Sequence, residues 1–203
     1  VLTFYNVFGP ATSLKFLLGK ESDGNRPLAD LIAEDSEAVK YALDVIAEDL
    51  SVLSERVIRE GGADGIYLSV QNIQDVRVTK AVYRSVIAPS EKKVLKAANK
   101  ASKTNILHIC GYEGSRNDLS LYRRYKAKAI NWAVTVEGVS LAEGKKLFGG
   151  KAVIGGFANT KGSLIHSGSG GDIESYTEQL IKETGSKGVI IGADCTVPAD
   201  IDL

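Results

Sequence analysis

The chain has 203 residues, of which 44% are hydrophobic and 25% are charged, and its 25 basic side chains balance 25 acidic ones. This composition is typical of a globular protein with a substantial core and excludes a disordered or low-complexity chain. Zero net charge provides no long-range field for nucleic acid or an anionic membrane, and no apolar run approaches the roughly 20 residues that span a bilayer, so we expect neither partner.

The number of cysteines and the N-terminal residues indicate the cellular compartment of the protein. Two cysteines are too few for the disulfide framework of a small secreted protein, and the chain does not begin with the charged and apolar pattern of a signal peptide. We therefore expect a cytoplasmic protein with reduced thiols. The chain opens directly on a strand-like run, Val1 to Phe8, which indicates a fragment of a longer chain.

Six apolar runs rich in β-branched residues predict six strands. They span residues 2–8, 64–70, 104–110, 129–134, 152–157 and 187–193. Helical periodicity predicts the connections between them. The clearest helix covers residues 36–59, with Ser36 as N-cap, Gly61 and Gly62 after its end, and one apolar face. That face comprises Val39, Leu43, Ile46, Leu50, Leu53 and Val57. Further helices are expected at 79–87 and 91–101, interrupted at Pro89, and at 119–128, 140–148 and 173–183.

Strands that alternate with helices predict an α/β fold with a parallel sheet. No Gly-x-Gly-x-x-Gly follows the first strand, where the sequence reads Gly9-Pro-Ala-Thr-Ser, so a dinucleotide-binding fold is not indicated. A (β/α)8 TIM barrel needs about 250 residues. We predict that residues 1–203 form one domain, the C-terminal part of such a barrel without its first strands. A complete open sheet of six strands is the alternative.

Soft metal ligands cluster at the predicted strand ends. His108 and Cys110 stand two residues apart, so their side chains point to the same side of an extended strand. Cys195 follows the last predicted strand. One imidazole and two thiols are ligands of zinc, and three protein ligands leave the open fourth position of a catalytic site, suited to activating a substrate thiol. A buried cysteine or histidine is also typical of an ordinary core, but the joint placement favours a metal.

Other polar residues follow the strands on the same predicted rim, where barrel enzymes place their active sites. They are Tyr67, Ser69, Gln71, Asn131, Trp132 and Asn159. Glu113, Glu137 and Asp194 are candidates for an acid, a base or a fourth ligand, although a solvated surface carboxylate is the simpler interpretation of each. His166 is expected in an exposed polar loop, and the glycine-rich segment 168–171 in a flexible surface loop. No catalytic residue is assigned.

Three segments of the sequence are similar to those of a known family. They are Gly62-Ala-Asp-Gly-Ile-Tyr-Leu-Ser69, the run from Gly138 to Phe157, and the ending Gly192-Ala-Asp-Cys-Thr-Val-Pro-Ala-Asp-Ile201. These segments resemble the uroporphyrinogen decarboxylase superfamily. The resemblance implies a (β/α)8 barrel and one of two activities. One is metal-free decarboxylation of a porphyrinogen. The other is zinc-dependent transfer of a methyl group from a methylated corrinoid protein to a thiol such as coenzyme M.

The ligand motif distinguishes these branches. The methyltransferase branch has His-x-Cys on one strand and a distant cysteine after the last strand, matched here by His108, Cys110 and Cys195. This resemblance implies zinc, a corrinoid supplied by a partner protein and a small thiol substrate. Ser69 matches a substrate-contacting serine of the decarboxylases, so that activity stays open. We predict substrate binding by Ser69, Tyr67 and Asn131. Cobalamin-independent methionine synthases share the zinc motif but match less well elsewhere, and a non-enzymatic partner-binding subunit is a third possibility.

Overall fold

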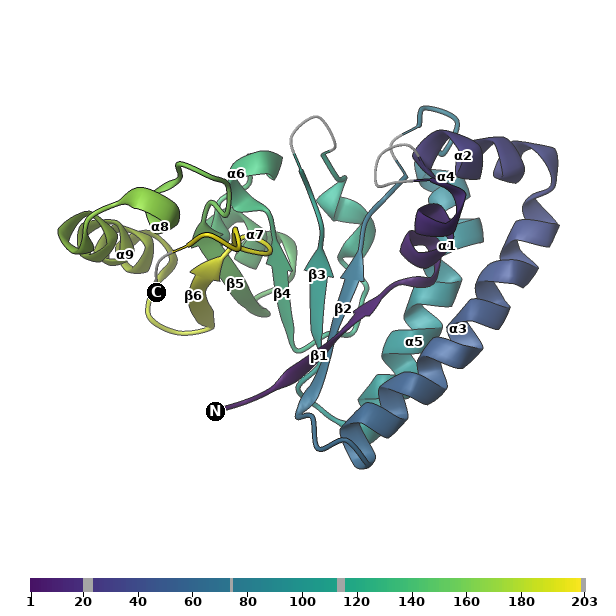
Figure 1. The fold of residues 1–203 in the computed structure, drawn as a ribbon, viewed down its shortest axis with the longest axis horizontal. Coiled ribbons are helices and arrows are strands. Elements are labelled where there is room, and N and C mark those ends of the chain that lie inside the picture. Colours follow the sequence, from purple (N-terminus) through teal and green to yellow (C-terminus); the bar gives the residue numbers. More distant parts are fainter. Residues whose placement is uncertain (20–23, 74, 113–115, 202–203) are drawn as a thin grey trace. The chain divides into compact units, whose positions relative to one another are not determined.

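The structure is a computed structural model that describes residues 1–19, 24–73, 75–112 and 116–201 (Figure 1). It divides into two compact units. Unit 1 comprises residues 1–108 and 117–128, and unit 2 comprises residues 109–116 and 129–203. The expectation that the whole chain is one domain of a longer protein stays a prediction.

Unit 1 contains the first three strands and the longest helix. Its elements are β1 (Phe4–Phe8), α1 (Pro10–Leu18), α2 (Asn25–Glu34), α3 (Ser36–Arg59), β2 (Gly65–Val70), α4 (Lys80–Val82), the π-helix η2 (Tyr83–Ile87), α5 (Ala88–Ala101), most of β3 (Ile106–Ile109) and the 3₁₀-helix η3 (Leu119–Tyr122).

Unit 2 contains the last three strands. Its elements are β4 (Ala129–Trp132), α6 (Val134–Glu137), α7 (Leu141–Leu147), β5 (Ala152–Phe157), α8 (Leu164–Ser167), α9 (Gly170–Thr184) and β6 (Val189–Ala193).

All six predicted strands are present, and their order in the sheet is the order of the chain, β1 to β6. Pairing is parallel from β1 to β2, from β4 to β5 and from β5 to β6. An open doubly wound sheet reverses its strand order at a switch point, whereas a barrel adds each strand beside the previous one. The chain-order sheet with intervening helices confirms the α/β class and is that of a partial TIM barrel.

The helix predicted at 36–59 is confirmed as α3, which packs along α5 (Figure 1). Two details of the prediction were wrong. The N-cap is Asp35, whose carboxylate accepts hydrogen bonds from the amides of Glu37 and Ala38, because Ser36 already lies in the first turn. Leu53 is 38% exposed, and the neighbouring Ser54 is buried in its place.

The helical connection after β2 is not interrupted at Pro89 as predicted. Residues 80–101 are continuously helical, and one wide turn, the π-helix η2, precedes α5. Pro89 lies in the first turn of α5, where an amide hydrogen has no partner within an ordinary helix and proline is tolerated. The π-helix therefore absorbs the irregularity without ending the helix.

Other segments differ from the predicted elements. Residues 119–128 form only the short η3 and a following loop. Tyr122 at the end of η3 and Tyr125 in the loop are both buried. Helix α9 begins within the glycine-rich segment expected to be a flexible loop, because Ser169 and Asp172 form a capping box that starts the helix at Gly170. The short α1, α2, α6 and α8 were not predicted.

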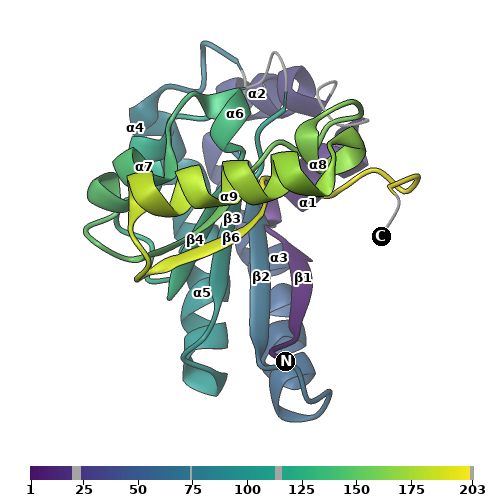
Figure 2. The same ribbon diagram turned by 90° about the vertical axis from the view of Figure 1, so that its left-hand side faces the viewer.

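In unit 2, α7 and α9 pack against each other, α7 on β5 and α9 on β6 (Figure 2). Ser140 and Glu143 form a capping box at the start of α7. Gly144 faces the indole ring of Trp132, and a Cβ at this position would lie 2.2 Å from the ring carbons. A glycine is therefore required for α7 to approach the sheet over Trp132.

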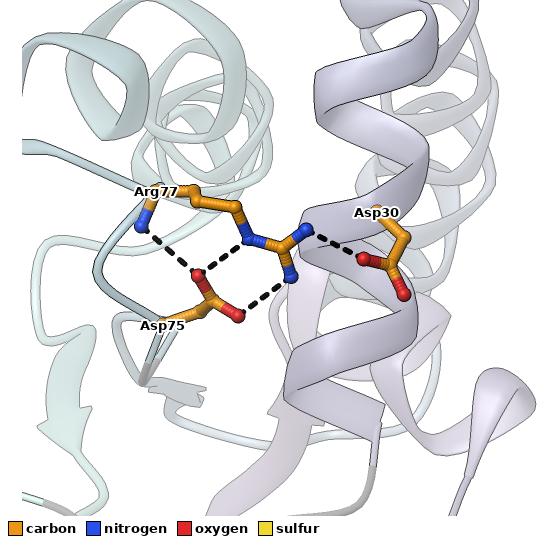
Figure 3. Close-up of polar contacts among 3 residues, drawn as sticks. All are labelled: Asp30, Asp75 and Arg77. Carbon is orange, nitrogen blue, oxygen red and sulfur yellow. Dashed lines mark hydrogen bonds and ion pairs between the residues drawn. The ribbon is translucent and has the colours of Figure 1, made fainter.

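Arg77 links the loop after β2 to helix α2 in unit 1 (Figure 3). Its guanidinium donates two hydrogen bonds to Asp75, at 2.9 and 2.8 Å, and one to Asp30 at 2.5 Å. The two guanidinium bonds to Asp75, with a further one from the Arg77 backbone amide, lower the pKa of Asp75 to about 2.

No helix among the described residues is long and apolar enough to cross a membrane.

Candidate metal centre

His108 and Cys110 lie at the carboxyl end of β3. Every residue of β3 is buried, and His108 is only 3% exposed. Cys110 follows the strand directly. The boundary between the two units falls between His108 and Ile109, within this strand, so the continuous backbone holds the two ligand candidates two residues apart.

Cys195 follows β6 in unit 2, and its Sγ lies 4.0 Å from the Sγ of Cys110. Both cysteines are half-buried, and neither forms a disulfide. One ligand atom from each of His108, Cys110 and Cys195 lies within 4.8 Å of the other two. The structure thus brings together the three predicted ligands, although 85 residues separate the cysteines in the sequence.

The spacing fits a tetrahedral ion. Two sulfur ligands about 2.3 Å from a tetrahedral zinc ion are about 3.8 Å apart, close to the separation of the two thiols. One nitrogen and two sulfur donors suit zinc better than magnesium or calcium, which prefer oxygen ligands. The three residues therefore fit zinc by donor type and distance, and their role as ligands stays a prediction.

Tyr67, a predicted substrate-binding residue, contacts the candidate ligand His108. Their rings are stacked, with centroids 5.0 Å apart and an interplanar angle of 25°. Tyr67 is half-buried in β2. A stacked ring restricts rotation of the imidazole about its side-chain bonds, so Tyr67 positions His108.

Ser69, the second predicted substrate-binding residue, is 4% exposed at the end of β2. Its hydroxyl donates a 2.6 Å hydrogen bond to Oδ1 of Asn6 in β1. The backbone carbonyl of Ser69 accepts a 2.7 Å bond from the amide of Gly9. These bonds join the ends of two adjacent strands, so Ser69 has a structural role whatever its role toward a substrate.

Asn131, the third predicted substrate-binding residue, is fully buried in β4. Its side-chain amide donates to the carbonyl oxygens of Ile154 in β5, at 3.0 Å, and Ala193 in β6, at 3.4 Å. The side chain thus bridges three neighbouring strands of unit 2. The sequence contains no signal of this bridge, because both acceptors belong to the backbone.

Asp194 corrects the expectation of a solvated carboxylate. It is 1% exposed and accepts hydrogen bonds from the amide of Thr135 at 3.0 Å and the amide of Gly156 at 2.9 Å. The Thr135 hydroxyl adds a third bond at 3.2 Å. Burial raises the pKa of Asp194, and the bonds from Thr135 and Gly156 oppose that rise. Asp194 therefore anchors the loop that carries Cys195.

The packing of β5 around Asp194 and Leu180 depends on two glycines. Gly155 and Gly156 have φ angles of 135° and 112°, a region that other residues rarely adopt. A Cβ on Gly155 would lie 3.2 Å from Oδ1 of Asp194, and one on Gly156 would lie 2.8 Å from Leu180. Gly155 therefore leaves room for the Asp194 carboxylate beside β5, and Gly156 leaves room for Leu180.

The remaining rim candidates occupy varied environments. Gln71 accepts a 2.6 Å bond from the ammonium of buried Lys15, Trp132 donates to the carbonyl of Val139, and Asn159 donates to the carbonyl of Thr196. Glu137 is 8% exposed, so its expected solvation was wrong. Glu113 lies outside the described residues.

His166 is the second histidine of the chain, and its expected exposure was also wrong. It lies in the short helix α8, with a side chain only 15% exposed. Its Nδ1 accepts a hydrogen bond from the amide of Gly162, and its Nε2 lies 3.4 Å from Oδ1 of Asp200. Among the residues that the structure describes, it belongs to no group of possible metal ligands.

The family follows from the comparison with protein-family models. The model described as uroporphyrinogen decarboxylase (URO-D) matches residues 2–203, almost the entire chain. The chain belongs to the URO-D family. This confirms the resemblance of the three sequence segments. A search of curated proteins finds no match.

Among solved structures, the URO-D chain is similar to a methyltransferase from Methanosarcina mazei. The TM-score is 0.73 at 16% sequence identity, and the match covers 97% of this chain and 53% of that one. The chain thus spans about half the length of that structure. At this identity the likeness establishes a shared fold.

Sequence reasoning missed Thr135 and predicted the wrong environment for Asp194, and both residues support the candidate site in this URO-D chain. Thr135 was not singled out, and Asp194 was expected on the surface, although together they hold the loop before Cys195. The order Ala-Asp-Cys at the end of a strand was the available signal. A buried carboxylate beside a ligand candidate requires hydrogen-bond donors, and the neighbouring backbone amides supply them only in the folded chain.

Proposed function

We propose that this protein is a zinc-dependent methyltransferase that moves a methyl group from a methylated corrinoid protein to a thiol such as coenzyme M. His108, Cys110 and Cys195 are the proposed zinc ligands. The observation that carries the proposal is the convergence of one imidazole and two thiols after β3 and β6. Membership of the URO-D family and the fold shared with a methyltransferase support it.

The donor set agrees with activation of a thiol. Two thiolates and one neutral imidazole balance the charge of a divalent ion and leave one tetrahedral position open for a substrate. Bound there, zinc would lower the pKa of a substrate thiol until it is a thiolate at neutral pH. Tyr67 and Asp194 hold His108 and the Cys195 loop in place before the substrate arrives.

The proposed reaction is a nucleophilic substitution at carbon. The sulfur–carbon bond forms while the cobalt–carbon bond breaks, the electron pair of the broken bond stays on cobalt, and Co(III) becomes Co(I). The proton of the thiol leaves to solvent. The chain has to hold the sulfur in line with the methyl group, which requires metal ligands in fixed positions.

Metal analysis tests the ligand set, and the two histidines provide a matched pair of variants. Purified wild-type protein is expected to contain about one zinc ion per chain, and His108→Ala and Cys195→Ala to lose most of it. His166→Ala removes the histidine outside the cluster and should retain zinc. Zinc-free wild-type protein after growth with added zinc, or equal retention by His108→Ala and His166→Ala, contradicts the proposal.

Activity distinguishes the two branches of the family. With methylcobalamin and coenzyme M, the wild type should form methyl-coenzyme M, and His108→Ala should be slower by at least about 100-fold. The alternative is metal-free porphyrinogen decarboxylation, favoured by the buried Ser69 at the end of β2. If His108→Ala still releases CO₂ from uroporphyrinogen and Ser69→Ala does not, the protein is a decarboxylase and the methyltransferase assignment is wrong.

A further inference from the structure

A basic groove in unit 1 takes no part in the proposed chemistry. Its lining comes from η2, α5, η3 and the loop after η3, and its volume is about 670 Å³. The residues that line it are Arg84, Lys92, Ser120, Leu121, Arg123 and Arg124. Four of these six carry a positive charge, in a chain whose net charge is zero.

The cations of the basic groove have no ion pair with a carboxylate among the described residues. Nearby acidic side chains are engaged elsewhere. Asp118 forms a 2.6 Å ion pair with Lys80, and Glu91 is buried and accepts hydrogen bonds from Tyr83 and Tyr125. No ion pair within the described part of unit 1 therefore neutralises the four cations, and the Glu91 carboxyl interacts with Lys92 electrostatically without a direct contact.

The walls of the basic groove are held rigidly. Arg84 lies in the π-helix η2, an irregularity that costs stability and occurs frequently at functional sites. The ammonium of Lys92 lies 5.2 Å from the centre of the Tyr125 ring. Tyr125 is itself fully buried and hydrogen-bonded to Glu91. The four cations are exposed at the groove, and Lys92 lies over this buried base.

From these observations we propose that the basic groove binds a small molecule that carries two or more phosphate groups. Its volume lies in the range of small-molecule pockets, about 300–1,000 Å³. Arginine forms paired hydrogen bonds with phosphate oxygens, and a phosphate monoester carries almost two negative charges at neutral pH. Two phosphate groups thus balance the four cations of the groove. This site is independent of the proposed metal centre.

Calorimetric titration of the purified protein with tripolyphosphate at about 0.15 M salt tests the groove. The double variant Arg84→Gln/Arg124→Gln should bind tripolyphosphate at least about tenfold more weakly than the wild type, because each arginine supplies charge-assisted hydrogen bonds. The control Arg26→Gln/Arg59→Gln makes the same charge change at two exposed positions outside the groove and should weaken binding less than about twofold. Thermal unfolding checks that both variants are folded.

Each of the following outcomes overturns the proposal. Equal weakening by both double variants, or no heat of binding with the wild type, means that the groove is an ordinary charged surface. Tighter binding of citrate than of tripolyphosphate assigns a carboxylate ligand instead. Tighter binding of an eight-residue oligothymidylate, lost in Arg84→Gln/Arg124→Gln, assigns a single-stranded nucleic acid.

Discussion

The ring of Tyr67 stacks on the imidazole of His108, with centroids 5.0 Å apart and an interplanar angle of 25°. One residue comes from β2 and the other from β3, so the tertiary structure of unit 1 fixes the plane of a proposed zinc ligand before any ion binds. A ligand held in one orientation loses less conformational freedom on binding than a freely rotating one. Tyr67 is accordingly a positioning residue.

Replacing the ring of Tyr67 should weaken zinc binding. Tyr67→Ala is expected to lower zinc affinity roughly 2- to 10-fold, since an aromatic pair contributes about 0.5–1.5 kcal/mol. Tyr67→Phe retains the ring and should stay within about twofold of the wild type. Competition with a chromophoric chelator measures both affinities. An equal loss in the two variants would assign the effect to the hydroxyl group and contradict the stacking argument.

The thiols of Cys110 and Cys195, 4.0 Å apart, are placed to form a disulfide when no metal separates them. A small shift would bring the sulfurs to the bond length of about 2.05 Å. Treatment of zinc-stripped protein with hydrogen peroxide should join the two thiols and reduce the peroxide to two molecules of water. Thiol titration should then fall from two to none per chain, while zinc-loaded protein keeps both thiols unreactive to peroxide.

A control variant shows whether this disulfide is intramolecular. Cys195→Ala leaves Cys110 as the single cysteine of the chain. After oxidation it should show no monomeric disulfide on a non-reducing gel. Oxidised wild-type protein that runs only as a cross-linked dimer would mean that the two sulfurs do not meet within one chain.

Removing the Asp194 carboxylate should destabilise the fold and the candidate site together. Asp194→Ala leaves the buried amides of Thr135 and Gly156 without their acceptor, at a cost of about 2–4 kcal/mol in the free energy of unfolding. Urea denaturation measures this loss. The control Asp200→Ala removes a carboxylate 55% exposed and should change stability by less than about 0.5 kcal/mol. Equal effects would mean that the Cys195 loop does not depend on Asp194.

Glu91 should make stability depend on pH. Burial raises its pKa from 4.5 to about 7, although hydrogen bonds from Tyr125 and Tyr83 lower it. The folded state therefore binds a proton that the unfolded state has released between pH 4.5 and 7. The stabilisation is fully present below pH 4.5, is lost as the pH rises toward 7, and has a magnitude of about 3 kcal/mol.

Urea denaturation of Glu91→Gln between pH 4.5 and 8 tests this assignment. Glutamine has a similar shape and does not titrate, so the decline in stability across this interval should become smaller by about 3 kcal/mol. The control Glu178→Gln alters an exposed residue of α9 and should follow the wild-type profile. A Glu91→Gln profile with the wild-type slope would locate the titrating group elsewhere.

Local patterns were sufficient to predict several parts of the fold. The six strands and helix α3 were recognisable because apolar periodicity reports which face of an element is buried. His108 and Cys110 were placed on one side of a strand by the alternation of side chains alone. Pro89 and the glycines at 170 and 171 led to wrong predictions, because these residue types usually interrupt helices. Here the π-helix η2 accommodates Pro89, and a capping box starts α9 at the glycines.

The amino-acid sequence by itself determined the α/β class, the family resemblance and the identity of the three soft ligand candidates. Only the tertiary structure decided that Cys110 and Cys195 lie 4.0 Å apart, that Tyr67 stacks on His108, and that Asp194 is buried. The physical reason is that periodicity records burial within one element. Distances between side chains of different elements depend on sheet register and on backbone hydrogen bonds. A backbone donor such as the amide of Gly156 is not visible in the sequence, because every residue type except proline supplies one.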